Sequence, residues 1–201
     1  MPCSKSGVWF RDASHGYLAG NCFGVIQGLY LYSTQDGGAI WKPVNLPAPA
    51  SLPEAFTKDS IACGAATPHF FDTQKGLVVV SCSDMVTNKA YRWVYQTKDG
   101  GTNWSSAVMP RSFGNYTFMN SDIGWYMGQT SAYATTGVNV YTTSDGGKNW
   151  KQISCTKWAG EMDYVDVKNG WIIARSGSEL ALVRTSDGGL IAIHLSSLEK
   201  F

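Results

Sequence analysis

Hydrophobic and aromatic residues recur along the chain in short runs of about five to seven, each closed by Gly, Asp, Asn or Ser. In one stretch these runs occupy 115–119, 125–128, 138–142 and 150–153. Short runs of this kind predict strands, whereas a helix would show a longer segment with a 3.6-residue period. The pattern therefore predicts units of four antiparallel strands, and no segment shows a convincing helical periodicity.

The same turn closes a strand-like run four times. Its core is Asp-Gly-Gly, and the aspartates of the four copies are Asp36, Asp99, Asp145 and Asp187. A Trp follows the Asp by five positions in three copies, as Trp41, Trp104 and Trp150. The fourth copy has Ala192 at that position. Consecutive glycines supply the positive φ of tight hairpins and Asp bonds its own backbone, so we expect these residues to hold turns.

A second motif, aromatic-x-Asp/Asn-x-x-x-Gly, alternates with the first. Its aromatic residues are Phe10, Phe70, Phe118 and Tyr164. A four-stranded unit that repeats about every 45 residues predicts a propeller blade. We predict an all-β propeller in a single domain, 1–201, with visible blades near 7–45, 64–110, 113–154 and 159–197. A closed four-bladed ring, a part of a larger ring, and a homo-oligomer that completes a larger ring are the alternatives.

The turn motif Ser/Thr-x-Asp-x-Gly-x-x-x-Trp resembles the Asp-box, or BNR repeat, of sialidases, sortilin-type receptors and secreted glycosidases. With the second motif added, the chain is most similar to the propellers of the photosystem II assembly and stability factor family and their non-photosynthetic bacterial relatives. The resemblance covers roughly 7–195. It implies a propeller scaffold and a polypeptide partner. Sialidase activity is not expected: the chain has only five arginines, Phe10-Arg11-Asp12 lacks the Pro of the family's Arg-Ile-Pro segment, and four blades are visible where that family has six.

The cysteines repeat in the same phase as the motifs. Cys3 and Cys63 each precede a motif Phe by seven residues, and Cys22 and Cys82 each follow a motif Gly by six. These spacings predict the disulfides Cys3–Cys22 and Cys63–Cys82, with Cys155 free; buried free thiols are the alternative. Disulfides indicate an extracytoplasmic protein, periplasmic or secreted, although the N-terminus does not read as a signal peptide.

Composition narrows the classes of function. The chain has 16 Lys and Arg against 15 Asp and Glu, which argues against a nucleic-acid partner. No apolar run is long enough for a membrane span. The box aspartates should diverge round a rim, and His15, His69 and His194 are isolated. We therefore expect no catalytic residue, metal site or cofactor.

Loops carried on a rigid scaffold are the expected binding surface. They include the Pro-rich connection at about 46–62. The candidate binding residues are Phe23, Phe56, Tyr133, Trp158, Glu161 and Arg175. Alternatively, the aromatic residues among them only cover the blade ends. The predicted function is a non-enzymatic binding or assembly-scaffold module for a polypeptide or glycan. The alternative is a carbohydrate-active protein, such as a glycoside hydrolase with carboxylates among Glu54, Asp84, Glu161 and Asp163.

Overall fold

The computed structural model describes residues 4–23, 31–51, 61–131, 137–176, 178–190 and 193–198. These residues form strands and turns and contain no helix, so the all-β prediction is confirmed. No helix that could cross a membrane occurs among them. The chain divides into two compact units, Met1–Met109 and Pro110–Phe201.

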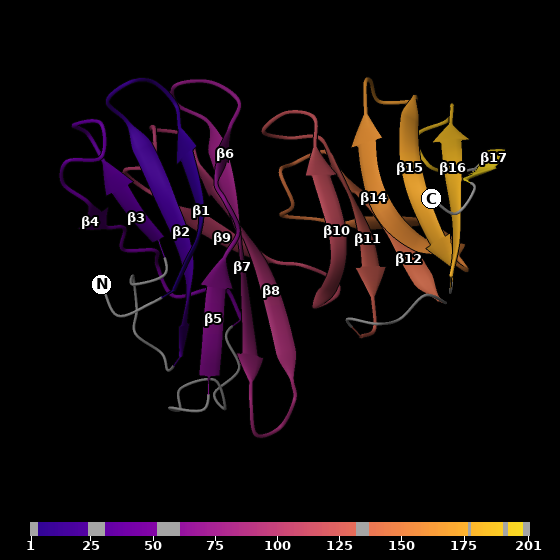
Figure 1. The fold of residues 1–201 in the computed structure, drawn as a ribbon, viewed down its shortest axis with the longest axis horizontal. Helices are drawn as coiled ribbons and strands as arrows, with labels where there is room; N and C mark the ends of the chain where they lie inside the picture. Colours follow the sequence, from indigo (N-terminus) through magenta and orange to yellow (C-terminus); the bar gives the residue numbers. More distant parts are fainter. Residues whose placement is uncertain are drawn as a thin grey trace. The chain divides into compact units, whose positions relative to one another are not determined.

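The first unit is one antiparallel sheet of nine strands (Figure 1). The strands are β1 (Ser4–Phe10), β2 (Gly16–Phe23), β3 (Leu31–Thr34), β4 (Lys42–Pro43), β5 (Ile61–Ala65), β6 (His69–Phe70), β7 (Gly76–Asp84), β8 (Ala90–Thr97) and β9 (Ser105–Val108). Their order is β4-β3-β2-β5-β7-β8-β9, with β1 beside β2 and β6 beside β7.

Strand β5 joins the two halves of this sheet. It pairs with β7, and its residues 62–64 also pair with residues 21–23 of β2. The strands of the blades predicted near 7–45 and 64–110 are joined by this pairing into one sheet, which the sequence did not predict. The physical reason is that β3 pairs only with Gly16–Ala19 of β2, so the backbone groups of the following residues 21–23 are left for β5 to pair with.

The second unit contains two four-stranded antiparallel sheets in simple sequential order (Figure 1). The first consists of β10 (Phe113–Phe118), β11 (Gly124–Gln129), β12 (Val138–Thr143) and β13 (Lys151–Thr156). The second consists of β14 (Ala159–Tyr164), β15 (Gly170–Ser176), β16 (Glu179–Thr185) and β17 (Ile193–Leu198). The strands expected at 115–119, 125–128, 138–142 and 150–153 are thus confirmed, with ends that differ by up to three residues.

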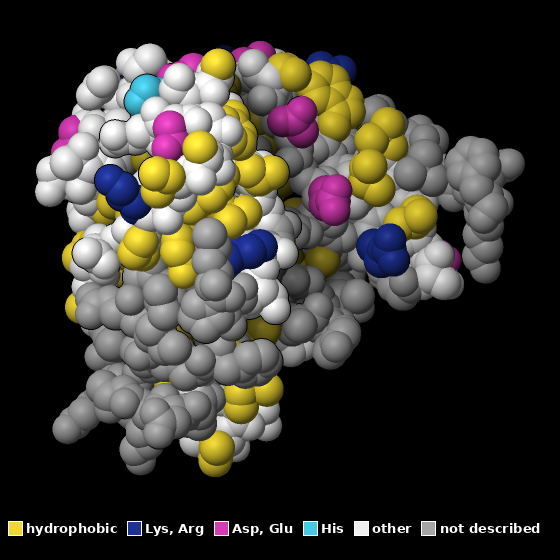
Figure 2. Space-filling model, turned by 60° about the vertical axis from the view of Figure 1, so that its left-hand side comes forward, with side chains coloured by type: hydrophobic (Ala, Val, Ile, Leu, Met, Phe, Trp, Pro, Cys, Tyr) yellow, Lys and Arg dark blue, Asp and Glu magenta, His cyan; other side chains and the backbone are white. Residues whose placement is uncertain are grey.

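Each unit has its own hydrophobic core, because alternate residues of a strand point to opposite faces of the sheet. In the second unit Trp125 and Val140 of one sheet pack with Met162 and Ile172 of the other. The surface of the first unit, which faces the viewer in Figure 2, mixes hydrophobic side chains with single charges of both signs. Neither sign of charge gathers into a patch on the described part of that face.

The Cys63–Cys82 disulfide is present, between directly opposed residues of β5 and β7. Cys155 is free and exposed. The expected partner of Cys22, Cys3, lies outside the described residues. In the backbone register Cys22 is opposite Cys63, which places three cysteine positions side by side across β2, β5 and β7.

The first residues of the Pro-rich connection are hydrogen-bonded to the sheet of the first unit. Its backbone carbonyls accept hydrogen bonds from two buried aromatic side chains of β8: Tyr95 Oη donates to Pro47 at 3.0 Å and Trp93 Nε1 donates to Ala50 at 2.8 Å. Buried polar tips of aromatic residues need such partners. The segment 52–60, with the expected site residue Phe56, lies outside the described residues.

Candidate binding site

The four Asp-Gly-Gly turns repeat one hydrogen-bond pattern. In the third copy the Thr143 hydroxyl donates to the Asp145 carboxylate at 2.9 Å and accepts from the Gly147 N–H at 2.8 Å. The backbone and side-chain amides of Asn149 donate to the same carboxylate at 2.9 and 2.7 Å. The equivalent threonines of the other copies make the first two bonds as well, and they are Thr34, Thr97 and Thr185. The carboxylates therefore hold their own turns.

These hydrogen bonds favour the ionised carboxylates. The backbone N–H of Ile40 lowers the pKa of Asp36, and that of Asn103 lowers the pKa of Asp99. For Asp145, burial is the largest single effect and raises the pKa, but the bonds from Asn149 and Thr143 outweigh it, so the pKa is lowered. A carboxylate with a lowered pKa is a poor general acid near neutral pH.

The second motif builds a matching turn at the same end of each four-strand repeat. The Asp72 carboxylate accepts from the backbone N–H groups of Gln74 and Lys75, both at 2.7 Å. The first glycine of each box then donates to a carbonyl of this turn, as Gly100 does to Gln74 at 2.8 Å. In the first unit the Arg11 guanidinium also donates to the Thr73 carbonyl at 3.0 Å. Among the described residues no three His, Cys, Asp or Glu come together as a metal site.

Each Trp of the first three boxes lies edge-on to the aromatic residue of the second motif. The ring centroids are 6.0 Å apart for Phe10 and Trp41, 6.1 Å for Phe70 and Trp104, and 5.9 Å for Phe118 and Trp150. The Trp104 indole N–H also donates to the Gly101 carbonyl at 2.9 Å. The indole therefore covers both its own turn and the neighbouring motif ring.

A further aromatic contact links neighbouring repeats inside each unit. In the first unit Tyr17 stacks on Phe70 with centroids 5.1 Å apart, and its hydroxyl donates to the Gly100 carbonyl at 3.0 Å. In the second unit Trp125 stacks on Tyr164 with centroids 3.7 Å apart, and its indole N–H donates to the Gly188 carbonyl at 3.0 Å. The two units thus place equivalent residues in equivalent contacts.

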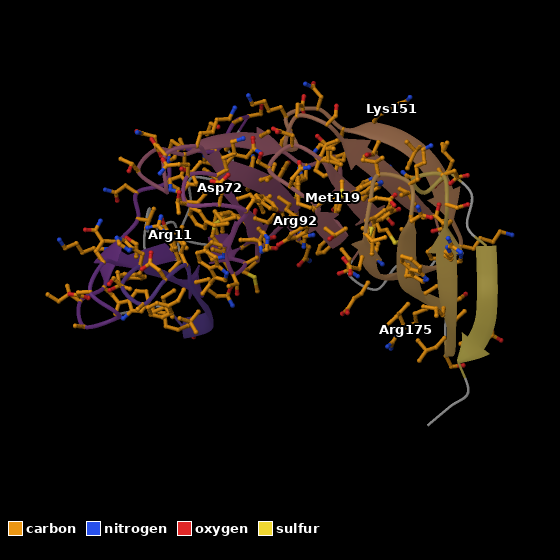
Figure 3. All side chains as sticks on the ribbon, turned by 90° about the horizontal axis from the view of Figure 1, so that it is seen from above. Arg11, Asp72, Arg92, Met119, Lys151 and Arg175 are labelled. Carbon is orange, nitrogen blue, oxygen red and sulfur yellow. A yellow bond between two sulfur atoms is a disulfide. The ribbon has the colours of Figure 1, made fainter. Side chains whose placement is uncertain are left out.

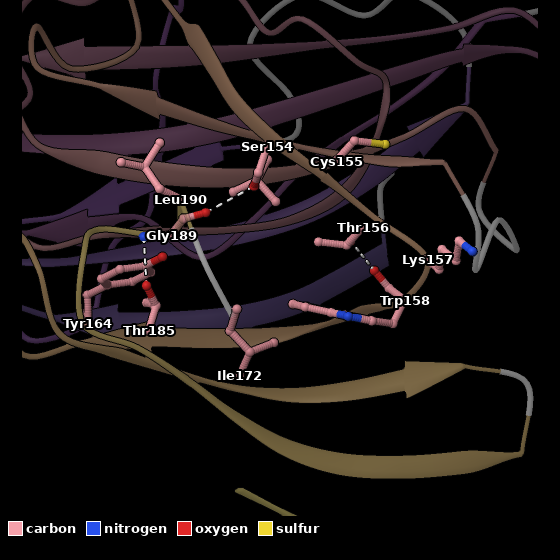
Figure 4. Close-up of a pocket in the computed structure, with 11 residues that line it drawn as sticks. Ser154, Cys155, Thr156, Lys157, Trp158, Tyr164, Ile172, Thr185, Gly189 and Leu190 are labelled. Carbon is pink, nitrogen blue, oxygen red and sulfur yellow. Dashed lines mark hydrogen bonds between the residues drawn. The ribbon is translucent and has the colours of Figure 1, made fainter. Parts of the chain in front are cut away.

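The fourth repeat carries a cavity of about 370 Å³ between the two sheets of the second unit, alongside β13 (Figure 4). Its lining residues are Val140, Ser154, Cys155, Thr156, Lys157, Trp158, Tyr164, Ile172, Thr185, Gly189 and Leu190. The indole of Trp158 and the phenol of Tyr164 enter this space from opposite ends (Figure 4). The cavity therefore has an aromatic group at each end, and its other lining residues are aliphatic and polar.

One polar atom in the cavity lacks a partner. Two buried side-chain polar atoms of the described residues make no hydrogen bond, Trp150 Nε1 and Tyr164 Oη, and of these residues only Tyr164 lines the cavity. Tyr164 is 6% exposed. Its burial, with a smaller contribution from the charge of Asp187, raises the pKa of the phenol to about 12, so the hydroxyl keeps its proton and can donate it.

The comparisons with known proteins establish the fold. No family model and no curated protein matches the sequence. A GH74 xyloglucanase from Xanthomonas campestris is similar with a TM-score of 0.55 at 10% identity, over 98% of this chain and 31% of that one. A polysaccharide lyase of the PL25 ulvan lyase family gives a TM-score of 0.54 at 8% identity, over 96% of this chain and 55% of that one.

This chain has a β-propeller fold. A structure of YCF48 bound to a D1 peptide is also similar, with a TM-score of 0.47 at 14% identity, over 96% of this chain and 82% of that one. The chain spans about a third of the xyloglucanase and about half of the lyase. At identities this low, the similarity to the xyloglucanase and the lyase shows a shared fold and does not show a shared activity.

The propeller scaffold brings only one of the expected binding residues, Trp158, into the cavity. Glu161 is exposed on the opposite face of its sheet, since it pairs with exposed Ile173 whereas the adjacent Met162 is buried. Arg175 is exposed as well and projects from the sheet (Figure 3). Three expected residues are not placed: Phe56 and Tyr133 lie outside the described residues, and the side chain of Phe23, at the end of β2, does too.

Sequence reasoning missed the cavity residue Tyr164 as a candidate for binding. A signal for it was present in the repeats. Three copies of the second motif carry Phe at this position, the fourth carries Tyr, and the fourth is also the copy whose box lacks Trp. The repeat that carries both of these differences is the one in which the cavity lies.

Proposed function

We propose that this chain is a non-enzymatic binding module that takes a polypeptide partner at the cavity beside β13. The module is one propeller domain, 1–201, with blades near 7–45, 64–110, 113–154 and 159–197. The observation that carries the proposal is the cavity itself. It is a concave, mainly apolar space in which Trp158 and the Tyr164 hydroxyl converge, and such spaces bind ligands.

The use of the carboxylates supports binding rather than catalysis. The box carboxylates accept hydrogen bonds within their own turns and carry lowered pKa values. The Asp163 carboxylate accepts from the backbone N–H of Tyr164 at 3.0 Å. Glu161, which would serve a glycoside hydrolase, is exposed on the sheet face opposite the cavity. None of these groups is among the cavity residues.

A carbohydrate ligand is the competing occupant, because an aromatic ring such as that of Trp158 also packs against sugar rings. The polar groups at the cavity favour a polypeptide. Ser154 already donates to the Gly189 carbonyl at 2.9 Å and Thr156 to the Trp158 carbonyl at 2.6 Å, which leaves few groups for the many hydroxyls of a sugar.

We also propose a cellular location for the protein. The Cys63–Cys82 disulfide fits an oxidising compartment, since cytosolic proteins are usually kept reduced. We place the binding module outside the cytoplasm, in the periplasm or the medium.

The test presents the purified protein with a displayed peptide library and, in parallel, with a glycan array. We expect selected peptides that lose affinity for Trp158→Ala and keep it for Glu161→Gln, and no binding to the array. Glycans that bind the wild type and not Trp158→Ala would contradict the proposal. Turnover of a bound glycan that is lost in Glu161→Gln would contradict it as well and would establish the carbohydrate-active alternative.

A further inference from the structure

Two residues that line the cavity, Tyr164 and Gly189, are the counterparts of residues that contact an indole in the second copy. In the second copy the Trp104 side chain contacts the Phe70 ring, the Tyr17 ring and the Gly101 carbonyl. The fourth copy has the counterparts of all three in the same mutual contacts, namely Tyr164, Trp125 and the Gly-Gly turn that ends at Gly189. Its sequence, however, has Ala192 in place of the Trp, at a position outside the described residues.

The Gly189 carbonyl accepts its hydrogen bond from a different donor in the fourth copy. The equivalent carbonyl, that of Gly101, accepts the indole N–H of Trp104 at 2.9 Å. In the fourth copy the acceptor receives the Ser154 hydroxyl from β13 instead, also at 2.9 Å (Figure 4). A ligand in this cavity therefore does not need to supply an indole N–H to that carbonyl.

The aromatic residue of the second motif also differs in the fourth copy, where it carries an additional hydrogen-bond donor. Tyr164 stands where Phe10, Phe70 and Phe118 stand in the other copies. Its buried hydroxyl has no partner and belongs to the cavity wall. An unpaired buried hydroxyl destabilises a protein, which a ligand with an acceptor at this point would relieve.

We propose that the cavity binds a tyrosine side chain of a polypeptide partner, with its ring in the space of the missing indole and its hydroxyl accepting a hydrogen bond from Tyr164 Oη. The inference deepens the proposed function and rests on it, because the partner is a polypeptide. A phenylalanine has no acceptor, and an indole offers only a donor. A histidine has an acceptor, but its polar ring suits the walls formed by Ile172, Leu190 and Trp158 less well.

The experiment measures binding of two soluble side-chain analogues by chemical-shift titration. The probes are N-acetyl-tyrosinamide and N-acetyl-phenylalaninamide, which differ only in the hydroxyl. We expect the wild type to bind the tyrosine analogue about tenfold more tightly, the factor that corresponds to one hydrogen bond. Tyr164→Phe should abolish this preference and bind both analogues alike.

A second variant supplies the indole that the fourth copy lacks in its sequence. Ala192→Trp restores the residue that the other copies carry at this position, so we expect it to fold and to bind neither analogue. Val165→Trp is the matched control, because Val165 is exposed and is not a cavity residue; it should bind as the wild type does.

Three results would overturn the inference: no binding of either analogue to the wild type, a preference for tyrosine that persists in Tyr164→Phe, or unchanged binding by Ala192→Trp. The proposed function can survive these results. If library-selected peptides bind the wild type and Ala192→Trp equally, the chain is a polypeptide-binding module whose site is elsewhere. If neither the analogues nor any peptide bind, both proposals fail.

Discussion

The phenol ring of Tyr164 lies parallel to the indole of Trp125, with ring centroids 3.7 Å apart and 2° between the ring planes. Trp125 belongs to β11 and Tyr164 ends β14, so the stack joins the two sheets of the second unit. In the first three copies of the repeat a Trp lies edge-on to the ring at the position of Tyr164. In the fourth, the ring is stacked on Trp125 and its hydroxyl lines a cavity.

The first prediction concerns the unpaired hydroxyl of Tyr164. Tyr164→Phe removes a buried donor without a partner, so we expect the free energy of unfolding to stay unchanged or to rise by up to about 1 kcal/mol. Tyr126→Phe is the matched comparison, because Tyr126 Oη donates to the Arg111 carbonyl at 2.8 Å, and we expect a loss of about 1–2 kcal/mol. Urea denaturation measures both. A loss above about 1 kcal/mol for Tyr164→Phe would show that its hydroxyl has a partner in the protein.

The second prediction concerns the buried threonine of the box. Thr143→Val keeps the side-chain shape but leaves the Gly147 N–H and one acceptor site of Asp145 unpaired. We expect it to lower the free energy of unfolding by about 1–3 kcal/mol. The control is Thr102→Val, which removes an exposed hydroxyl bonded at 3.2 Å and should change stability by less than about 0.5 kcal/mol. Equal effects of the two changes would contradict a structural role for the box threonine.

The third prediction concerns acid. The N–H groups of Lys75 and Gln74 lower the pKa of Asp72 in the folded protein below the ordinary value of 3.8. An acid with a lowered pKa stabilises the fold above the ordinary value, and this contribution disappears as the pH falls through the folded pKa. We therefore expect stability to change little between about pH 7 and 5 and to fall below about pH 4.

A variant isolates the contribution of this carboxylate. Asn120 holds the same turn in the third copy, since its amide oxygen accepts from the backbone N–H groups of Asp122 and Ile123, both at 2.9 Å. Asp72→Asn should therefore fold and show a smaller loss of stability in acid than the wild type. Urea midpoints recorded from neutral pH down to pH 2.5 test this. An acid profile identical to that of the wild type would refute the contribution of Asp72.

The fourth prediction concerns the cysteines. Cys155 is free, exposed and part of the cavity wall, whereas Cys63 and Cys82 are bonded to each other. We expect an alkylating reagent to modify Cys155 in the native protein, and to reach Cys63 and Cys82 only after reduction. N-acetyl-tyrosinamide in the cavity should slow the modification of Cys155. Peptide mapping after alkylation would also show whether Cys3 is bridged to Cys22, and labelling of Cys63 without reduction would contradict the structure.

The repeats made the turns predictable because local contacts fix them. Gly124 follows the Phe118 motif because the Phe118 ring packs against it: a Cβ there would lie 2.5 Å from the ring. The Asp-Gly-Gly spacing has the same local origin, since Asp145 and Thr143 bond groups within a few residues. Such requirements appear in the sequence at fixed spacings, and they placed the strands of the second unit to within a few residues.

Contacts between distant segments were less predictable. The pairing of β2 with β5 uses backbone groups, which any sequence supplies. For this reason no pattern of side chains in the sequence predicted the joined sheet. The cavity brings together Trp158 and Tyr164, which come from separate segments of the repeat. Trp158 was predicted as an exposed loop residue, and the structure places it partly buried against the core of the second unit.

The most direct test is a crystal structure of the protein with N-acetyl-tyrosinamide bound. We predict that the ligand ring lies between Trp158 and Tyr164, with its hydroxyl about 2.6–3.0 Å from Tyr164 Oη. A cavity that stays empty at saturating ligand, or one occupied by a side chain of the protein itself, would contradict it.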